Sequence, residues 1–170
     1  MSAESIYDLV VIGSGHGGYV AAVRAAQNGL TTAIVEKDPK LGGTCLHRGC
    51  IPTKALLESA SIYDHVRHAA TWGIKVDGSS VDWPAVQKRK DKVVAKNAAG
   101  IDFLMKKNKI TPYRGHGRLA GKGKVTVTAQ DGSVQELKTR RVLLAMGSVP
   151  RARMAGAGMK KLFEMSAKKR

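Results

Sequence analysis

The feature that most constrains the fold is a glycine pattern near the N-terminus. An apolar run rich in β-branched residues, Ile6 to Ile12, leads directly into Gly13-Ser14-Gly15-His16-Gly17-Gly18, which has the form G-x-G-x-x-G. In this pattern the first glycine permits a tight turn and the second lets backbone approach a pyrophosphate, while the third lets the next helix pack against the strand. Apolar residues at helical spacing then continue to about Asn28, and Gly29 stands where a glycine commonly ends a helix.

A second strand is predicted at Thr31 to Val35, and it ends at an acidic residue, Glu36. An acid roughly 20 residues after the first glycine can accept hydrogen bonds from the ribose hydroxyls of an adenine nucleotide. The order strand, glycine turn, helix, strand and acid therefore predicts an α/β fold. It is a Rossmann-like dinucleotide-binding domain, with a parallel sheet flanked by helices. The pattern alone does not separate FAD from NAD.

The two cysteines of the chain, Cys45 and Cys50, lie close together in the sequence. Their spacing is neither that of zinc sites nor that of thioredoxin-like redox sites. On a regular helix, residues five apart point about 140° away from each other, so a bond between the sulfurs requires unwound backbone between them. Gly49 supplies freedom for that break, and Pro52 suits the first turn of a helix that resumes afterwards.

A loop closed between such near neighbours lowers the entropy of the unfolded chain only slightly, so this pair would be a poor structural staple. Arg48 and Lys54 lie nearby in the sequence, and positive charge favours the thiolate form of a cysteine. We therefore interpret the pair as a redox couple. Flavin is the usual carrier of electrons between a nicotinamide hydride and a thiol. This chemistry assigns the first nucleotide site to FAD.

The glycine turn, Glu36 and the stretch from Gly42 to Lys54, GGTCLHRGCIPTK, together resemble the N-terminal part of the pyridine nucleotide–disulfide oxidoreductases. The likeness runs from about Ile6 to Arg151. Within the family it is strongest to the members that oxidise dihydrolipoamide in 2-oxo acid dehydrogenase complexes. Reductases of glutathione and of mercuric ions share the cysteine motif and stay open as alternatives. A third alternative, from another class, is a non-catalytic FAD-binding fragment.

The resemblance implies a role for each matching residue. Cys45 matches the thiol that exchanges with the external dithiol, Cys50 the thiol that lies against the flavin, and Lys54 a lysine beside the reactive edge of the flavin ring. No metal site is implied, and His65 and His68 are interpreted as part of a solvated helix face. The positions expected to bind FAD are Gly13, Ser14, Gly15, Gly18, Glu36, Lys37, Gly43, Thr44, Lys54, Gly117 and Gly147.

Beyond the cysteines the pattern predicts two helices, from Lys54 to Trp72 and from Pro84 to Lys107, the second with a basic and solvated face. Short strands follow, with a hairpin turn at Asp131-Gly132. They resemble the small antiparallel β-meander that the family inserts in its FAD domain, here at about 110–140. A last apolar strand, Arg141 to Ala145, returns to the sheet. Three positions depart from the family pattern: His16, His47 and Met146.

The expected domain organisation is an incomplete FAD-binding domain, residues 1–153, followed by a basic tail, residues 154–170, that does not match the family. The family's NAD-binding domain and its C-terminal interface domain, which carries an acid–base pair, have no counterpart in the 170 residues. We therefore expect a truncated chain that has no turnover by itself.

The net charge of +16 raises the question of nucleic-acid binding. The basic residues are scattered, and only 5% of residues are aromatic, so no RNA-binding pattern is present and we expect no nucleic-acid partner. The sequence contains no apolar run near the ~20 residues that span a bilayer, and its polar start predicts no signal peptide. Without these segments we expect a cytoplasmic protein. The resemblance implies NAD as co-substrate. It also implies a lipoyl dithiol substrate, a homodimer and a 2-oxo acid dehydrogenase complex as partner.

Overall fold

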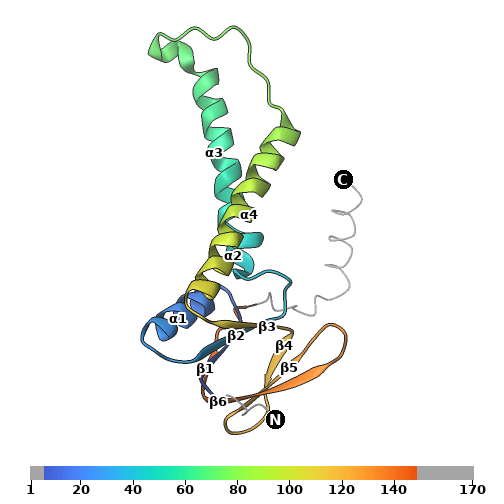
Figure 1. Cartoon of the computed structure of the whole chain (residues 1–170). Helices are drawn as coiled ribbons and strands as arrows, with labels where there is room; N and C mark the ends of the chain where they lie inside the picture. The colour runs from blue at the N-terminus through green and yellow to red at the C-terminus, as the bar shows by residue number, and fades with distance from the viewer. Residues whose placement is uncertain (1–5, 149–170) are drawn as a thin grey trace, which may run out of the picture.

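A computed structural model describes residues 6–148 of the chain (Figure 1). Six strands form one sheet in the order β3-β2-β1-β6-β5-β4. The strands are β1 (Tyr7–Ile12), β2 (Thr32–Glu36), β3 (Thr111–Arg114), β4 (His116–Leu119), β5 (Lys124–Thr128) and β6 (Val134–Leu144). The helices are α1 (His16–Gln27), α2 (Gly43–His47), α3 (Cys50–Arg67) and α4 (Trp83–Lys107), with a short 3₁₀ helix, η1 (Ala69–Trp72), after α3.

The parallel part of the sheet consists of β3, β2, β1 and β6. Val10 of β1 lies opposite Ala33 of β2 on one side and Val142 of β6 on the other. Val10 and Ala33 are fully buried. A strand segment with neighbours on both sides and cover on both faces must be apolar, which explains the run from Leu9 to Ile12 in β1. This part of the fold confirms the Rossmann-like prediction.

Strand β6 belongs to both parts of the sheet. Its first half pairs antiparallel with β5, where Glu136 lies opposite Thr126, and its second half pairs parallel with β1. The antiparallel β-meander is present, but it begins later than the sequence pattern indicated. Strand β3 pairs parallel with β2, with Tyr113 opposite Val35. The meander therefore starts at His116 and not near Ile110, because β3 first extends the parallel part at its edge.

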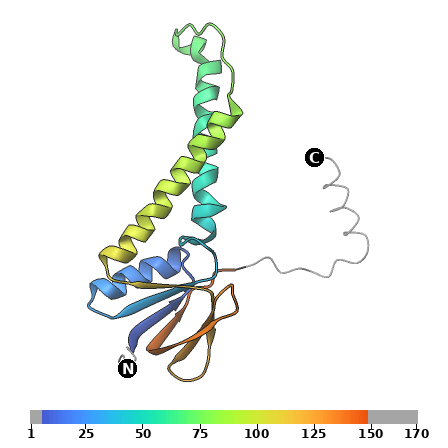
Figure 2. The ribbon, with the colours of Figure 1, turned by 45° about the vertical axis from the view of Figure 1, so that its right-hand side comes forward.

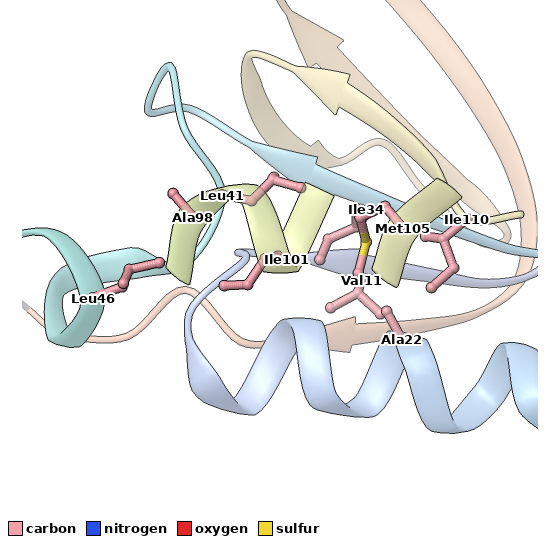
Figure 3. Packing of buried hydrophobic residues seen from close by; sticks show 9 residues of the cluster. All are labelled: Val11, Ala22, Ile34, Leu41, Leu46, Ala98, Ile101, Met105 and Ile110. Atoms are coloured by element: carbon pink, nitrogen blue, oxygen red, sulfur yellow. The ribbon is translucent and has the colours of Figure 1, made fainter. Parts of the chain in front are cut away.

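Two apolar cores cover the two faces of the parallel strands. One lies between the sheet and the helices (Figure 3) and contains Val11, Ala22, Ile34, Leu41, Leu46, Ala98, Ile101, Met105 and Ile110. The other lies between the parallel strands and the meander strands, on the opposite face. It contains Val10, Ile12, Ala33, Val35, Val125, Val127 and Leu137. Neighbouring residues along a strand point to opposite faces, so β1 and β2 supply alternate residues to the two cores.

Helices α3 and α4 lie side by side and project away from the sheet as an arm (Figures 1 and 2). Asp82 caps α4 by accepting a hydrogen bond from the Ala85 N–H at 3.0 Å, and a proline occupies its first turn. The basic face of α4 is mostly exposed, as predicted, and this includes Arg89. Its guanidinium donates to the Ala55 carbonyl oxygen of α3 at 2.8 Å and so joins the two helices.

Within residues 6–148, none of the helices combines the length and the apolar character needed to cross a bilayer. The same residues contain no group of three or more histidine, cysteine or acidic side chains arranged to hold a metal ion. His68 of the predicted solvated pair lies within 3.3 Å of the Asp64 carboxylate, on an exposed part of α3.

Candidate functional site

The glycine turn joins β1 to α1. Gly13 has a φ of +102°, and its N–H donates to the Val35 carbonyl oxygen at 2.8 Å. A Cβ at Gly13 would overlap the carbonyl oxygen of Ala145, and a Cβ at Gly18 would overlap that of Gly13. Gly15 differs, because nothing lies within 4 Å of the place where its Cβ would stand. Two of the glycines are thus required by the turn itself, and the third opens onto free space at the start of α1.

Ser14 and Glu36 form a buried pair at the end of the two central strands. Ser14 has no exposed surface, and Glu36 is 7% exposed. The Ser14 N–H donates to Oε2 of Glu36 at 2.9 Å, and the Ser14 hydroxyl donates to the same oxygen at 2.6 Å. The other carboxylate oxygen, Oε1, accepts from the Asp38 N–H at 2.9 Å. The carboxylate is therefore fixed against the glycine turn.

The charge state of Glu36 follows from this environment. Burial raises the pKa of the carboxyl group, but hydrogen bonds from the Asp38 N–H and from the hydroxyl and N–H of Ser14 lower it by more, so the net pKa lies below its ordinary value. Glu36 is consequently ionised at neutral pH. An ionised carboxylate accepts hydrogen bonds and is suited to bind hydroxyl donors such as those of a ribose.

The cysteine pair lies where the helix breaks. Helix α2 ends at His47 and α3 begins at Cys50, and Cys45 and Cys50 are joined as a disulfide with their Cα atoms 4.8 Å apart. This confirms the predicted unwinding between the two residues, with the proline in the first turn of α3. A Cβ at Gly49 would lie 3.3 Å from the Thr44 carbonyl oxygen, so the crossing between the helices is tight.

Lys54 lies one turn after Cys50 on α3, and both residues are exposed. Residues four apart on a helix share a face, so the lysine and the sulfur of Cys50 lie on the same side of α3. The sequence placed Arg48 beside the cysteines as a second cation. In the structure its guanidinium pairs with the Asp38 carboxylate at 2.7 Å, and the Arg48 side chain is largely exposed whereas that of Asp38 is half-buried. Its charge is thus shared with an acid, which weakens the argument that it favours a thiolate.

Backbone contacts join the glycine turn to the cysteine segment. The Gly42 N–H donates to the Ser14 carbonyl oxygen at 3.1 Å and to the Ser14 hydroxyl oxygen at 3.2 Å. Gly43, with a φ of +66°, packs so closely that a Cβ there would lie 2.6 Å from the Gly15 Cα. His47, one of the departures from the family pattern, is 2.8 Å from the Leu41 carbonyl oxygen through Nε2. The glycine turn and the cysteine segment, which the sequence predicted as separate motifs, are therefore in direct contact.

A hollow of about 410 Å³ lies beyond the end of β2. It is lined by Lys37, Asp38, Pro39, Arg114, Gly115, Ala129, Gln130 and Asp131. Of the predicted cofactor-binding residues, only Lys37 lines it. Gly117 lies on β4, where a Cβ would stand 3.0 Å from Cγ2 of Ile12, so a larger residue would press on the core.

The remaining predicted positions are more open. Thr44 on α2 is exposed, and Gly147 follows β6 with a φ of +73° and is exposed as well. Met146, where the family pattern has threonine, is 65% exposed. These three positions are thus open to solvent, unlike the buried Ser14–Glu36 pair.

Sequence reasoning missed several residues of this region. Asp38 was not considered, although it donates its N–H to Glu36 and pairs with Arg48. Arg114 and Gln130 enter the hollow from strands and turns that are remote in the sequence. No periodicity or spacing marks such contacts in a single sequence, because they depend on how β3 and the meander are placed against β2.

The fold and the site define a class: a dinucleotide-binding α/β domain whose glycine turn packs against a disulfide-bonded cysteine pair. A family model described as pyridine nucleotide-disulphide oxidoreductase matches residues 7–168. The chain belongs to this family, whose members are FAD-binding enzymes that use NAD. The matched range extends past residue 153. The tail itself lies outside the described residues.

Curated relatives agree with the family. The chain is 50% identical over 153 residues to dihydrolipoyl dehydrogenase of Bacillus subtilis, covering 85% of this chain and 32% of the relative. It is 48% identical to dihydrolipoyl dehydrogenase of Chlamydia pneumoniae, and the match covers 85% of this chain and 31% of that relative. It is also 46% identical to leghemoglobin reductase of Glycine max, and the match covers 83% of this chain and 27% of that relative. The chain thus spans about a third of the length of the curated relatives it matches.

Proposed function

We propose that this chain binds FAD and carries the redox-active disulfide of a dithiol–disulfide oxidoreductase of the dihydrolipoyl dehydrogenase type. In that function electrons pass from dihydrolipoamide to the Cys45–Cys50 disulfide, then to FAD and finally to NAD. The observation that supports this best is the packing of Gly43 on Gly15, because it holds the cysteine segment directly against a dinucleotide-type glycine turn. The similarity to two dihydrolipoyl dehydrogenases favours a lipoyl substrate.

The residues present are suited to hold FAD. The free space at Gly15 and the N-terminal amides of α1 would receive the pyrophosphate, and the ionised Glu36 would receive the ribose hydroxyls. Lys37 and the hollow beside it would border the adenine side. The remaining proposed contacts are those of Gly13, Ser14, Gly18, Gly43, Thr44, Lys54, Gly117 and Gly147. The bound flavin would supply a two-electron acceptor next to the sulfurs.

The chemistry of the cysteines is a thiol–disulfide exchange. A thiolate of the substrate attacks the sulfur of Cys45, the bond between Cys45 and Cys50 breaks, and Cys50 leaves as a thiolate. The second substrate thiol then attacks the mixed disulfide and releases Cys45 as a thiol. The substrate dithiol is oxidised by two electrons and the protein disulfide is reduced by two. Lys54, on the same face of α3 as Cys50, would stabilise the Cys50 thiolate by its positive charge.

The same proposal includes a homodimer and an association with a 2-oxo acid dehydrogenase complex in the cytoplasm. It rests here on the names of the relatives and on the family resemblance alone. Because the 170 residues span about a third of those relatives, we expect this stretch by itself to show no NADH–lipoamide turnover. Measurable turnover by the purified chain would contradict that expectation.

A visible absorption spectrum of the purified chain, reconstituted with FAD, tests the proposal. We expect a flavin band, and a long-wavelength charge-transfer band after partial reduction. In Cys45→Ser the band should persist without reductant, because Cys50 then remains as a free thiolate. In Cys50→Ser it should be absent. A chain that remains colourless and does not take up FAD would overturn the proposal.

The choice of substrate needs its own comparison. The FAD-loaded chain is mixed with dihydrolipoamide or with glutathione at equal thiol concentration, and the charge-transfer band is followed in time. A lipoyl substrate predicts faster reduction by dihydrolipoamide. Faster reduction by glutathione would instead favour the glutathione-reductase alternative.

A further inference from the structure

We propose that Ser14 is a positioning residue that links the carboxylate of Glu36 to the backbone from which the cysteine segment begins. This inference deepens the proposed function and rests on it for the identity of the nucleotide. The link itself concerns only residues of this chain. Within residues 6–148, the Ser14 hydroxyl contacts both segments at once, which distinguishes it from its glycine neighbours.

The hydrogen bonds around the Ser14 hydroxyl run in one direction. Its oxygen accepts the Gly42 N–H at 3.2 Å, an N–H that the Ser14 carbonyl oxygen also accepts at 3.1 Å. Its proton is donated to Oε2 of Glu36 at 2.6 Å. A hydroxyl that donates to an ionised carboxylate becomes a better acceptor, so each bond strengthens the other. Ser14 is fully buried, and water therefore does not compete for either bond.

The two ends of this chain of bonds belong to different parts of the proposed site. Glu36 ends β2 and is the group expected to hold the ribose. Gly42 precedes α2, which carries Cys45. Gly43 lies against Gly15, so the two loops meet through backbone atoms without an intervening side chain at that contact. The Ser14 hydroxyl is thus a buried side-chain link between the carboxylate and the cysteine segment. A second link, through the Asp38 N–H and the Asp38–Arg48 ion pair, lies at a more exposed position.

Alanine fits the space of Ser14 and removes only the hydroxyl, so Ser14→Ala should fold. The matched control is Thr139→Val, which removes the hydroxyl of a residue that is only 4% exposed and donates to the Arg141 carbonyl oxygen at 2.8 Å, within β6. Thermal unfolding of both variants compares their general loss of stability. A purely structural role for Ser14 predicts that the two variants behave alike in every other measurement.

Amide hydrogen exchange of the chain without added FAD measures the link directly. In Ser14→Ala the Gly42 N–H keeps its bond to the carbonyl oxygen of residue 14 and loses the hydroxyl. We therefore expect Gly42 to exchange faster, by at most about fivefold, the factor that one whole hydrogen bond contributes. We expect no change at Gly42 in Thr139→Val. In the double variant Ser14→Ala/Glu36→Gln, exchange at Gly42 should be no faster than in Ser14→Ala, because both substitutions interrupt the same chain of bonds. Unchanged exchange in Ser14→Ala, or additive effects in the double variant, would overturn the inference.

FAD titration by fluorescence quenching tests the effect of Ser14 at Glu36, the other end of the chain of hydrogen bonds. We expect the Kd of Ser14→Ala to rise about tenfold, because a hydrogen bond to a charged carboxylate orients it, and the Kd of Thr139→Val to change less than twofold. Equal affinities of Ser14→Ala and the unchanged chain would count against the positioning role. If the unchanged chain binds no FAD, the proposed function fails, and the exchange experiment still decides whether Ser14 links the two segments.

Discussion

The sheet end of the molecule and the α3–α4 arm are stabilised in different ways. At the sheet end, Val10, Val11 and Ile34 are fully buried, and both faces of the parallel strands are covered. In α3 the buried residue is Ala55, near the start of the helix, and Trp72, just beyond its end, is 79% exposed. The arm has local helix bonds, an N-cap, the Arg89 contact between its helices and apolar side chains that are only half-buried, such as Leu56 and Val93.

This difference explains where the candidate site lies. The disulfide lies where α3 begins. The arm leaves the sheet end of the molecule there (Figure 2), and the glycine turn belongs to that sheet end. A site at this junction takes its geometry from the rigid part. Substitutions in the sheet should therefore change stability and cofactor binding together, whereas substitutions along the outer arm should change little.

The largest effect is expected at the contact between the glycine turn and α1. Gly18→Ala places a Cβ on the carbonyl oxygen of Gly13, so we expect a loss of more than about 4 kcal/mol or no folded chain. Gly17→Ala is the control, since Gly17 is also in α1 but has free space around it, and alanine there should stabilise by about 0.5–1 kcal/mol. Urea unfolding followed by circular dichroism measures both. Similar stabilities of the two variants would contradict the close packing.

Truncation of a core residue should come next. Ile34→Ala removes a fully buried side chain between β2 and the helices and should cost about 2–5 kcal/mol. Leu57→Ala, on α3, removes a side chain that is 61% exposed and should change stability by less than about 0.5 kcal/mol. The same urea titration compares them. A large loss in Leu57→Ala would show that the arm is covered in solution, for example by a second copy of the chain.

The N-cap of α4 should have a smaller effect. Asp82→Ala removes the acceptor for the Ala85 N–H and should cost about 1 kcal/mol. Asp82→Asn retains an oxygen acceptor and serves as the control. The midpoint of thermal unfolding measures the difference. Equal midpoints for the two variants would mean that the end of the arm frays without contributing to the stability of the whole.

The smallest effect is expected in the acid range. The pKa of Glu36 is lowered in the folded chain, so its contribution to stability is present above the ordinary pKa of 4.5 and is lost as the pH falls through the folded value. The unfolding free energy should therefore decrease below about pH 4.5. Glu36→Gln should show a weaker decrease over the same range. Identical pH profiles would show that Glu36 is not held by hydrogen bonds.

Much of the fold followed from local patterns. The strand and turn before α1, the end of α4 at Lys107 and the break between the cysteines each depend on residues within one turn or one strand of each other. The placement of β3, the Arg89 contact and the Asp38–Arg48 pair were not predicted. They join segments that are far apart in the sequence, and a single chain without related sequences shows no pattern for such pairs. Ser14 was named as a cofactor contact, but its link to Gly42 became visible only when three segments were placed together.

Strand β6 pairs both with β5 and with β1, and this affects how the chain folds during synthesis. Strand β1 is synthesised early, yet its partner on one side is β6, the last strand within residues 6–148, in the register of Tyr7 with Thr139. The ribosome adds about 5–20 residues per second, so β1 and its apolar surface are synthesised on the order of ten seconds before β6. The pairing of β1 with β2 and the cover by α1 use neighbouring sequence and can form at once. The long interval leaves one edge of the central strand open to wrong partners, and chaperone binding to the growing chain would protect that edge.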